Sequence, residues 1–244
     1  MTLIAGKFVT LQGSEVIWSP TNPNISRSIL FGAIPFTHTG VRGTWALNEK
    51  VSLIAGVNNG WDQLTDSNKG KTAELGATLN PIKPLSITVS GYSGQEVTAT
   101  DPTTGAPTNN GTRTSLNAVA SYTIIDPLSV GLEVLNVRQE NAGGGTTTQK
   151  YNGFAGYGSY LFTPKLRGAV RVERFDDKNG FRFATAAGTK YAEATVTGAY
   201  LAADSFELRA EARRDQTNNP VFVDFKGVAS KTLMTIALQG LYKF

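Results

Sequence analysis

The sequence of 244 residues predicts an all-β chain, a single domain (residues 1–244) that forms an up-and-down antiparallel β-barrel of about twelve strands. Apolar and polar residues alternate along most of the chain, as expected of strands whose two faces meet different surroundings. Short and long connections also alternate, which is typical of a meander of hairpins. Glycine is frequent, with 26 residues, and cysteine is absent, which excludes disulfides and cysteine-ligated metals.

The alternation is clearest in residues 205–214, SFELRAEARR. In a helix, its glutamates and its arginines would form like-charge pairs four residues apart, which are mildly destabilising. In a strand, the apolar residues share one face and opposite charges become neighbours on the other. The two faces would be Phe206, Leu208, Ala210 and Ala212 against Glu207, Arg209, Glu211 and Arg213. A strand is therefore predicted here, although its residues have high helix propensity.

Twelve segments follow this pattern, and most are close to the roughly 9–11 residues that a tilted strand needs to cross a bilayer. The predicted strands are 2–10, 38–47, 51–61, 71–80, 84–94, 112–124, 128–139, 150–162, 165–176, 190–201, 205–215 and 231–244. Short connections lie at 48–50, 81–84, 125–127, 163–165 and 203–205, and long polar ones at 11–37, 62–70, 95–111, 140–149, 177–189 and 216–230. No linker divides the chain.

The composition of the two faces predicts a transmembrane barrel with its apolar face toward lipid. Small residues are frequent on that face, and lipid tails adapt to them, whereas a wide soluble core would need bulk. They are Ala73, Ala77, Ala118, Ala120, Gly156, Gly158, Ala192 and Ala194. A barrel of twelve strands with Arg and Glu inside is also too wide for its side chains to fill the interior without water. A soluble β-barrel or sandwich, which would bury the apolar face, is the alternative.

Aromatic residues on the apolar face suggest two interfacial belts. One set lies near the short turns: Trp45, Tyr122, Tyr160, Phe162, Tyr200, Phe206 and Tyr242. The other lies near the long connections: Phe8, Trp61, Tyr151, Phe154 and Phe175. No run of about 18 apolar residues is present, so no transmembrane helix is expected.

The sequence also disfavours several other functions and features. The net charge of +4 is spread along the chain without a basic block, so no nucleic acid partner is expected. The first residues, MTLIAGKFVT, lack a basic n-region followed by an apolar h-region, so no signal peptide is expected in this chain. His38 is the only histidine and no G-x-S-x-G motif is present, so no enzyme, catalytic site, cofactor or metal site is predicted.

Three segments resemble the OmpL-like β-barrel porins of Gram-negative bacteria: AGKFVTLQGSEVIWSP (5–20), SRSILFGAIPFTHTGVR (26–42) and VNNGWD (57–62). The resemblance covers most of the chain and implies an outer-membrane location, with outer-membrane lipid and the assembly machinery as partners. Members usually carry a signal peptide and further strands before the GKFVT segment, so it also implies N-terminal shortening. The C-terminal GLYKF is similar to the last strand of outer-membrane proteins, which implies that Tyr242 and Phe244 are the assembly signal.

The predicted function is a porin-like channel for passive diffusion of ions or small polar solutes. The expected pore-lining residues are Lys7, Arg42, Glu74, Arg113, Glu133, Arg167, Arg171, Glu173, Glu193, Glu207, Arg209, Glu211 and Arg213. Basic residues slightly outnumber acidic ones in this set, which favours a weak anion preference. The alternatives are a structural or adhesive barrel with a closed lumen, and a soluble ligand-binding barrel.

The long connection 11–37 is the strongest functional candidate outside the strands. It is rich in Pro and Asn, yet it contains Trp18, Ile29, Leu30, Phe31 and Phe36. These apolar residues could fold it into the lumen as a constriction, with Arg27 nearby, or it could remain a surface loop that packs on its neighbours. The sequence leaves both possibilities open, and it does not predict an oligomeric state.

Overall fold

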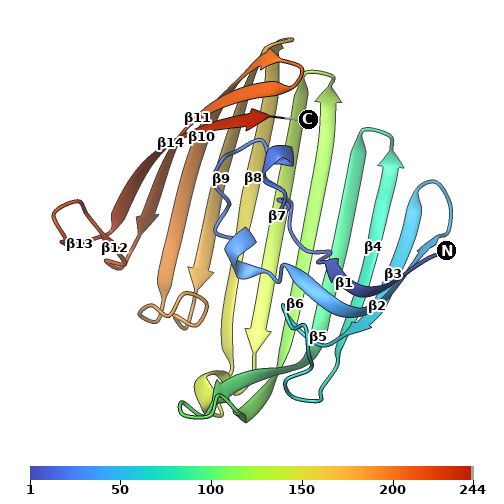
Figure 1. The fold of residues 1–244 in the computed structure, drawn as a ribbon, viewed down its shortest axis with the longest axis vertical. Helices are drawn as coiled ribbons and strands as arrows, with labels where there is room; N and C mark the ends of the chain where they lie inside the picture. Colours follow the sequence, from blue (N-terminus) through green and yellow to red (C-terminus); the bar gives the residue numbers. More distant parts are fainter. Residues whose placement is uncertain (243–244) are drawn as a thin grey trace.

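The computed structural model describes residues 1–242, in which twelve strands form one antiparallel sheet in chain order (Figure 1). Their bounds are β1 (Thr2–Val9), β2 (Thr37–Ala46), β3 (Val51–Asn58), β4 (Thr72–Ile82), β5 (Leu85–Thr100), β6 (Pro107–Ile125), β7 (Leu128–Gln139), β8 (Gln149–Thr163), β9 (Leu166–Asp177), β10 (Thr189–Ala203), β11 (Phe206–Thr217) and β14 (Thr232–Tyr242). Every predicted strand has its counterpart, so the all-β, up-and-down antiparallel architecture is confirmed.

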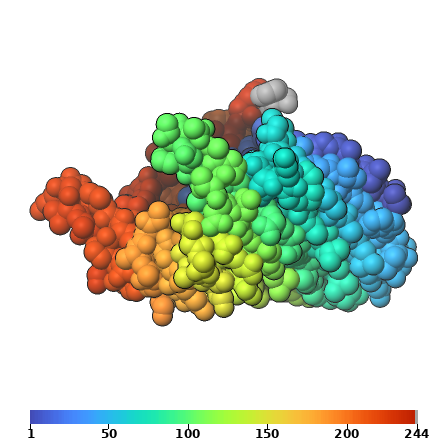
Figure 2. All heavy atoms as spheres, turned by 90° about the horizontal axis from the view of Figure 1, so that it is seen from below, coloured from blue at the N-terminus to red at the C-terminus, as the bar shows by residue number. Residues whose placement is uncertain are grey.

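The sheet is strongly curved, and β1 and β14 are its two edges. Seen from the end that carries the long connections, the strands follow an arc in chain order (Figure 2). The other elements are small: three 3₁₀ turns, η1 (Ser19–Thr21), η2 (Phe31–Ala33) and η3 (Ala142–Gly144), and a hairpin of β12 (Phe222–Val223) with β13 (Ala229–Ser230). None of the helices in residues 1–242 has the length and hydropathy needed to span a membrane.

The prediction of a long polar connection at 95–111 is wrong. β5 continues to Thr100 and β6 starts at Pro107, so most of this segment is a hairpin that extends beyond its neighbours. The register shifts between Val97 and Ala99 and again before Thr100. These residues are largely polar on both faces, with Val97 and Ala99 as apolar exceptions, so the alternation that reveals the other strands is weak here.

The two faces of the sheet have the predicted inverted polarity. We call the face against which residues 11–36 lie the inner face, and the opposite one the outer face. On β9, Val170 and Val172 of the outer face are 50% and 55% exposed, whereas Arg171 and Glu173 of the inner face are 0% and 3% exposed. Apolar side chains outside and charged ones inside are the pattern of a barrel wall that faces lipid.

The aromatic belt near the short turns is confirmed for six of its seven members, because Trp45, Tyr160, Phe162, Tyr200, Phe206 and Tyr242 are all exposed on the outer face, whereas Tyr122 is half-buried. The second belt is wrong. Phe154 is exposed, but Tyr151 and Phe175 are 1% exposed and Trp61 is 7% exposed, because they point inward and pack under residues 11–36. Phe8 also lies on the inner face, where its ring lies 4.3 Å from the guanidinium of Arg42.

The orientation of the sheet leads to a first prediction. Val170→Arg, in the middle of the outer face of β9, should lower the free energy of unfolding in lipid vesicles by about 2–4 kcal/mol. Asn136→Arg, on the outer face of β7 near the long connections, is the control and should cost only about 0–1 kcal/mol. Urea unfolding of both variants in vesicles measures the difference. Equal losses would show that the outer face does not cross the hydrocarbon.

Candidate functional site

Residues 11–36, which we call the inner loop, cross the inner face of the sheet rather than its rim (Figure 1, blue ribbon between β1 and β2). The loop enters at Gly13, whose φ of +96° suits glycine, and a side chain there would meet Ile34. The Gly13 N–H donates to Asn117 Oδ1 (3.0 Å), and the next N–H, of Ser14, donates to Glu133 (2.9 Å). The inner loop therefore lies against the inner face and is not a surface loop, a choice that the sequence left open.

Carboxylates of the wall bind backbone N–H groups in the middle of the inner loop. Glu211 accepts hydrogen bonds from the N–H groups of Ile25 (2.6 Å) and Ser26 (2.9 Å). Glu173 accepts from the N–H of Ile29 with both oxygens (2.7 and 2.9 Å). These bonds to ionised acceptors are stronger than bonds between neutral groups. They fix a segment that has almost no regular secondary structure.

Arginines of the same wall bind the loop carbonyls. Arg209 donates to the carbonyl of Asn22 (2.7 Å) and to that of Pro20 (3.1 Å). Arg213 donates to the carbonyl of Arg27 (2.6 Å). A peptide group offers both a donor and an acceptor, so a wall of alternating Glu and Arg satisfies both. The charged face of residues 205–214 thus binds the backbone of the inner loop.

Arg171 is the centre of a buried ionic cluster between β9, β10 and the inner loop. Its side chain is 0% exposed and contacts Glu15 of the loop (2.7 Å), Glu193 of β10 (3.0 Å) and the carbonyl of Ser26 (2.9 Å). Glu173 lies 3.9 Å away. Removing one member of such a cluster leaves buried charge uncompensated, which is strongly destabilising. The cluster therefore ties the loop to the wall.

The second half of the inner loop is held by apolar packing. Leu30 and Ile34 are 0% and 1% exposed and belong to the buried hydrophobic cluster of the described residues. Its other members outside the loop are Trp61, in the connection after β3, and the wall residues Leu135, Val137, Tyr151, Ala155, Phe175 and Tyr191. The Tyr151 hydroxyl also donates to the carbonyl of Ala33 (2.8 Å). These aromatic side chains near the long connections therefore point inward to pack against the second half of the inner loop.

The predicted pore-lining residues lie on the inner face, with one correction. Ile4 of β1 pairs with Arg42, which is buried on the inner face. Lys7 lies three residues further along β1 and pairs with Thr39, so the alternation of side chains along the strand places Lys7 on the outer face. Nine residues are buried: Arg42, Glu74, Glu133, Arg171, Glu173, Glu193, Glu207, Arg209 and Glu211. Arg113, Arg167 and Arg213 are half-buried.

Several buried wall charges also pair with one another. Arg42 forms a two-point ion pair with Glu74, and Glu207 binds both Arg167 (2.5 Å) and Arg209 (2.6 Å). The wall is thus neutralised locally rather than lined by isolated charges.

The sequence analysis missed Glu15, which is 7% exposed and is the only acidic residue of the inner loop. A single carboxylate in a Pro- and Asn-rich stretch was the available signal. Arg27 was identified, and it is half-buried, with its guanidinium 5.3 Å from the Phe31 ring and 3.2 Å from the Ile17 carbonyl. Partial burial lowers the pKa of Arg27 from its usual value.

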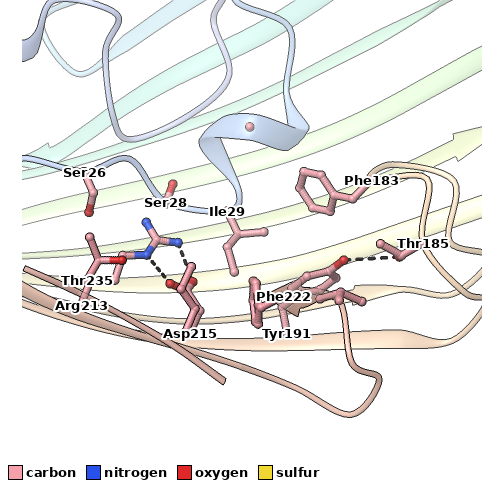
Figure 3. A pocket seen from close by; sticks show the side chains of 13 residues that line it. Ser26, Ser28, Ile29, Phe183, Thr185, Tyr191, Arg213, Asp215, Phe222 and Thr235 are labelled. Atoms are coloured by element: carbon pink, nitrogen blue, oxygen red, sulfur yellow. Dashed lines mark hydrogen bonds and ion pairs between the residues drawn. The ribbon is translucent and has the colours of Figure 1, made fainter. Parts of the chain in front are cut away.

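A cavity of about 600 Å³ lies between the inner loop and strands β10, β11 and β14 (Figure 3). On one side Arg213 and Asp215 form an ion pair (2.7 Å). On the other side the lining is apolar and includes Ile29, Phe183 and Phe222. The cavity opens on the same inner face as the loop, so a small solute beside the loop would contact both the ion pair and the apolar lining.

Comparisons with known proteins agree with this arrangement. The family model described as "Putative beta-barrel porin-2, OmpL-like" matches residues 1–243. In vitro folded OmpT, an outer membrane protein of Vibrio cholerae, has a similar structure, with a TM-score of 0.64 and 16% identity over 98% of this chain and 75% of that one. OmpT in a trimer form gives a TM-score of 0.63 and 15% identity, with 98% and 74% covered.

The anion-selective porin from Comamonas acidovorans is also similar, with a TM-score of 0.65 and 9% identity over 86% of this chain and 60% of that one. A search of curated proteins found no match. At these identities the solved structures show the fold, that of transmembrane β-barrels, and the family match covers nearly the whole sequence. The chain therefore belongs to the OmpL-like β-barrel porin family of the bacterial outer membrane.

Proposed function

We propose that this chain forms the wall and the internal constriction of an outer-membrane channel through which ions or small polar solutes diffuse passively. The observation that carries the proposal is the inner loop, which crosses the inner face and is fixed there by ionised wall residues. A polar, hydrated passage lowers the cost of moving a charged or polar solute across the hydrocarbon layer. The family membership supports this function.

The distribution of exposed charge supports a weak anion preference. The wall glutamates that bind the inner loop, Glu133, Glu173 and Glu211, are covered by the loop and nearly inaccessible. Two arginines, Arg113 of β6 and Arg27 of the loop, remain partly exposed and join no carboxylate among residues 1–242, whereas Arg213 is paired with Asp215. A solute passing beside the loop would therefore meet more positive than negative charge. The route that we propose passes the cavity beside Arg213.

We also propose that the chain has no enzymatic activity. Its only histidine, His38, is 0% exposed, its ring stacks on Tyr92 with 4.4 Å between centroids, and its Nδ1 lies 3.0 Å from the Gly60 carbonyl. A general base needs access to a substrate proton. No group of three potential metal ligands occurs within residues 1–242.

Recognition by the assembly machinery of the outer membrane is a further part of the proposal. It rests on the sequence of the last strand, where Tyr242 is 67% exposed on the outer face. Phe244, the other residue of the expected signal, lies outside the residues that the structure describes.

The proposed constriction gives a prediction about loop dynamics. The double substitution Glu173→Gln and Glu211→Gln should speed hydrogen exchange of the amides at Ile25, Ser26 and Ile29. Each charge-assisted bond contributes about 2 kcal/mol, so exchange should become about tenfold faster or more. Hydrogen–deuterium exchange with mass spectrometry measures this. Channel currents should become larger or noisier in the same variant.

Glu207→Gln is the matched control, because Glu207 lies on the same wall but its side chain binds only Arg167 and Arg209. Its effect on exchange in the inner loop should be small. Unchanged exchange in the double variant would contradict the role of these carboxylates in holding the loop.

Ion selectivity provides a second prediction. Arg27→Glu replaces a positive charge of the inner loop with a negative one, so the reversal potential under a salt gradient should shift toward cation selectivity. The shift should shrink at 1 M salt, where the Debye length falls from about 10 Å at 0.1 M to about 3 Å. Planar-bilayer recordings test this, with Lys165→Glu at a short turn as the control. Folded protein that conducts no current would overturn the channel itself.

The terminal strand gives a third prediction. Deleting Phe244 should reduce insertion into the outer membrane of cells much more than it reduces refolding in detergent, because a recognition step rather than barrel stability is lost. Comparing the membrane fraction of expressed protein with refolding yield in vitro measures both. Normal insertion of the deletion variant in cells would refute the assembly signal.

A further inference from the structure

The outer face carries a row of basic residues at the end where the long connections lie. This basic row consists of Arg138, Lys150, Arg174, Lys190 and Arg214, all exposed, on the neighbouring strands β7 to β11 (Figure 1). Strand register relates their positions: Arg138 pairs with Lys150, Lys190 pairs with Asp176, two residues beyond Arg174 on β9, and Arg214 pairs with Ala194, which in turn pairs with Val172. The row occupies the place that the sequence suggested for a second aromatic belt.

The basic row lies at the edge of the apolar band. On β9, the outer face carries Leu166, Val170 and Val172 before it reaches Arg174. The eight residue steps from Leu166 to Arg174 span about 27 Å along the strand, or about 20 Å along the membrane normal for a tilt of about 40°. That height is comparable to the roughly 25 Å of the apolar band of such barrels, so the row lies at the level of lipid headgroups.

Two of these arginines flank a groove in the outer face. Register places Arg174 opposite Ala192 on β10, and Ala194, two residues further, opposite Arg214 on β11. The groove has a volume of about 340 Å³; the two alanines, Phe154 and Val172 form its apolar part, and Glu173, Glu193 and Gln216 also line it. Because strands are about 4.8 Å apart, the two arginine Cα atoms are separated by roughly 12 Å, which both guanidinium groups can bridge.

The charges of this groove are not used within the protein. Among residues 1–242, no ion pair joins Arg174 or Arg214 to a carboxylate. By contrast, the arginines Arg171, Arg209 and Arg213 of the inner face are all paired. Unpaired guanidinium groups beside an apolar floor match a ligand that carries both an anionic group and a hydrocarbon chain.

We propose that Arg174 and Arg214 bind the phosphate of a phosphorylated lipid in the outer leaflet, with one of its acyl chains lying over Ala192 and Ala194. Arginine donates bidentate hydrogen bonds to phosphate, and the small side chains leave room for the chain. Lys190 and Lys150 extend the positive surface along the headgroup layer. This site faces away from the channel, so it does not depend on conduction.

The test uses the full chain refolded in a neutral detergent and purified diphosphorylated lipid A as the probe, titrated by native mass spectrometry. Arg174→Gln with Arg214→Gln should weaken binding by about tenfold or more. Lys83→Gln with Lys165→Gln removes the same charge from exposed positions at the short-turn end, and it should bind like wild type. Ala194→Trp fills the groove but keeps both arginines, and it should also weaken binding.

Inorganic phosphate at the same concentration separates a lipid site from a phosphate site, and it should not displace the lipid. Displacement by phosphate would overturn the lipid assignment. Wild-type affinity in the arginine variant would overturn the site, and so would an equal loss in the lysine control, which indicates diffuse charge attraction. Far-UV circular dichroism verifies folding. If the double variant does not fold, Arg214→Gln alone and Ala194→Trp provide the same comparison.

Discussion

The inner loop has few backbone hydrogen bonds of its own, and ionised side chains of the wall satisfy its peptide groups instead. Buried N–H and C=O groups need partners, and an irregular segment inside a barrel cannot take them from a ladder. Glu173 and Glu211 accept from the loop's N–H groups, whereas Arg209 and Arg213 donate to its carbonyls. The charged side chains of β9 and β11 on the inner face meet this constraint.

The same contacts explain why so much charge can be buried in this protein. A buried ion is costly unless it is paired and hydrogen-bonded. Arg171 is enclosed by Glu15, Glu193 and the Ser26 carbonyl, and it joins the loop to two strands at once. Because the loop and the wall each carry part of the cluster, neither can be rearranged without exposing the other's charge. Buried charge on both sides therefore holds the inner loop to the wall.

The two faces of the sheet divide the functions of the chain. The inner face uses its carboxylates to hold the loop, and Arg27 of the loop and Arg113 of the wall remain partly exposed. The outer face is apolar at its centre, aromatic near the short turns and basic near the long connections. Arg174 and Arg214 differ from Arg171, Arg209 and Arg213 of the inner face because no ion pair within residues 1–242 neutralises them.

The sequence by itself determined the strands and which of their faces is apolar, because alternation along a strand is a local property. It failed at residues 95–111, where β5 and β6 extend as a hairpin that is largely polar on both faces. Only the tertiary structure decided the course of the inner loop and the inward direction of Tyr151 and Phe175. These depend on contacts between residues far apart in the chain, such as Ile25 with Glu211, 186 positions away, and no local pattern specifies which partner a buried peptide group will find.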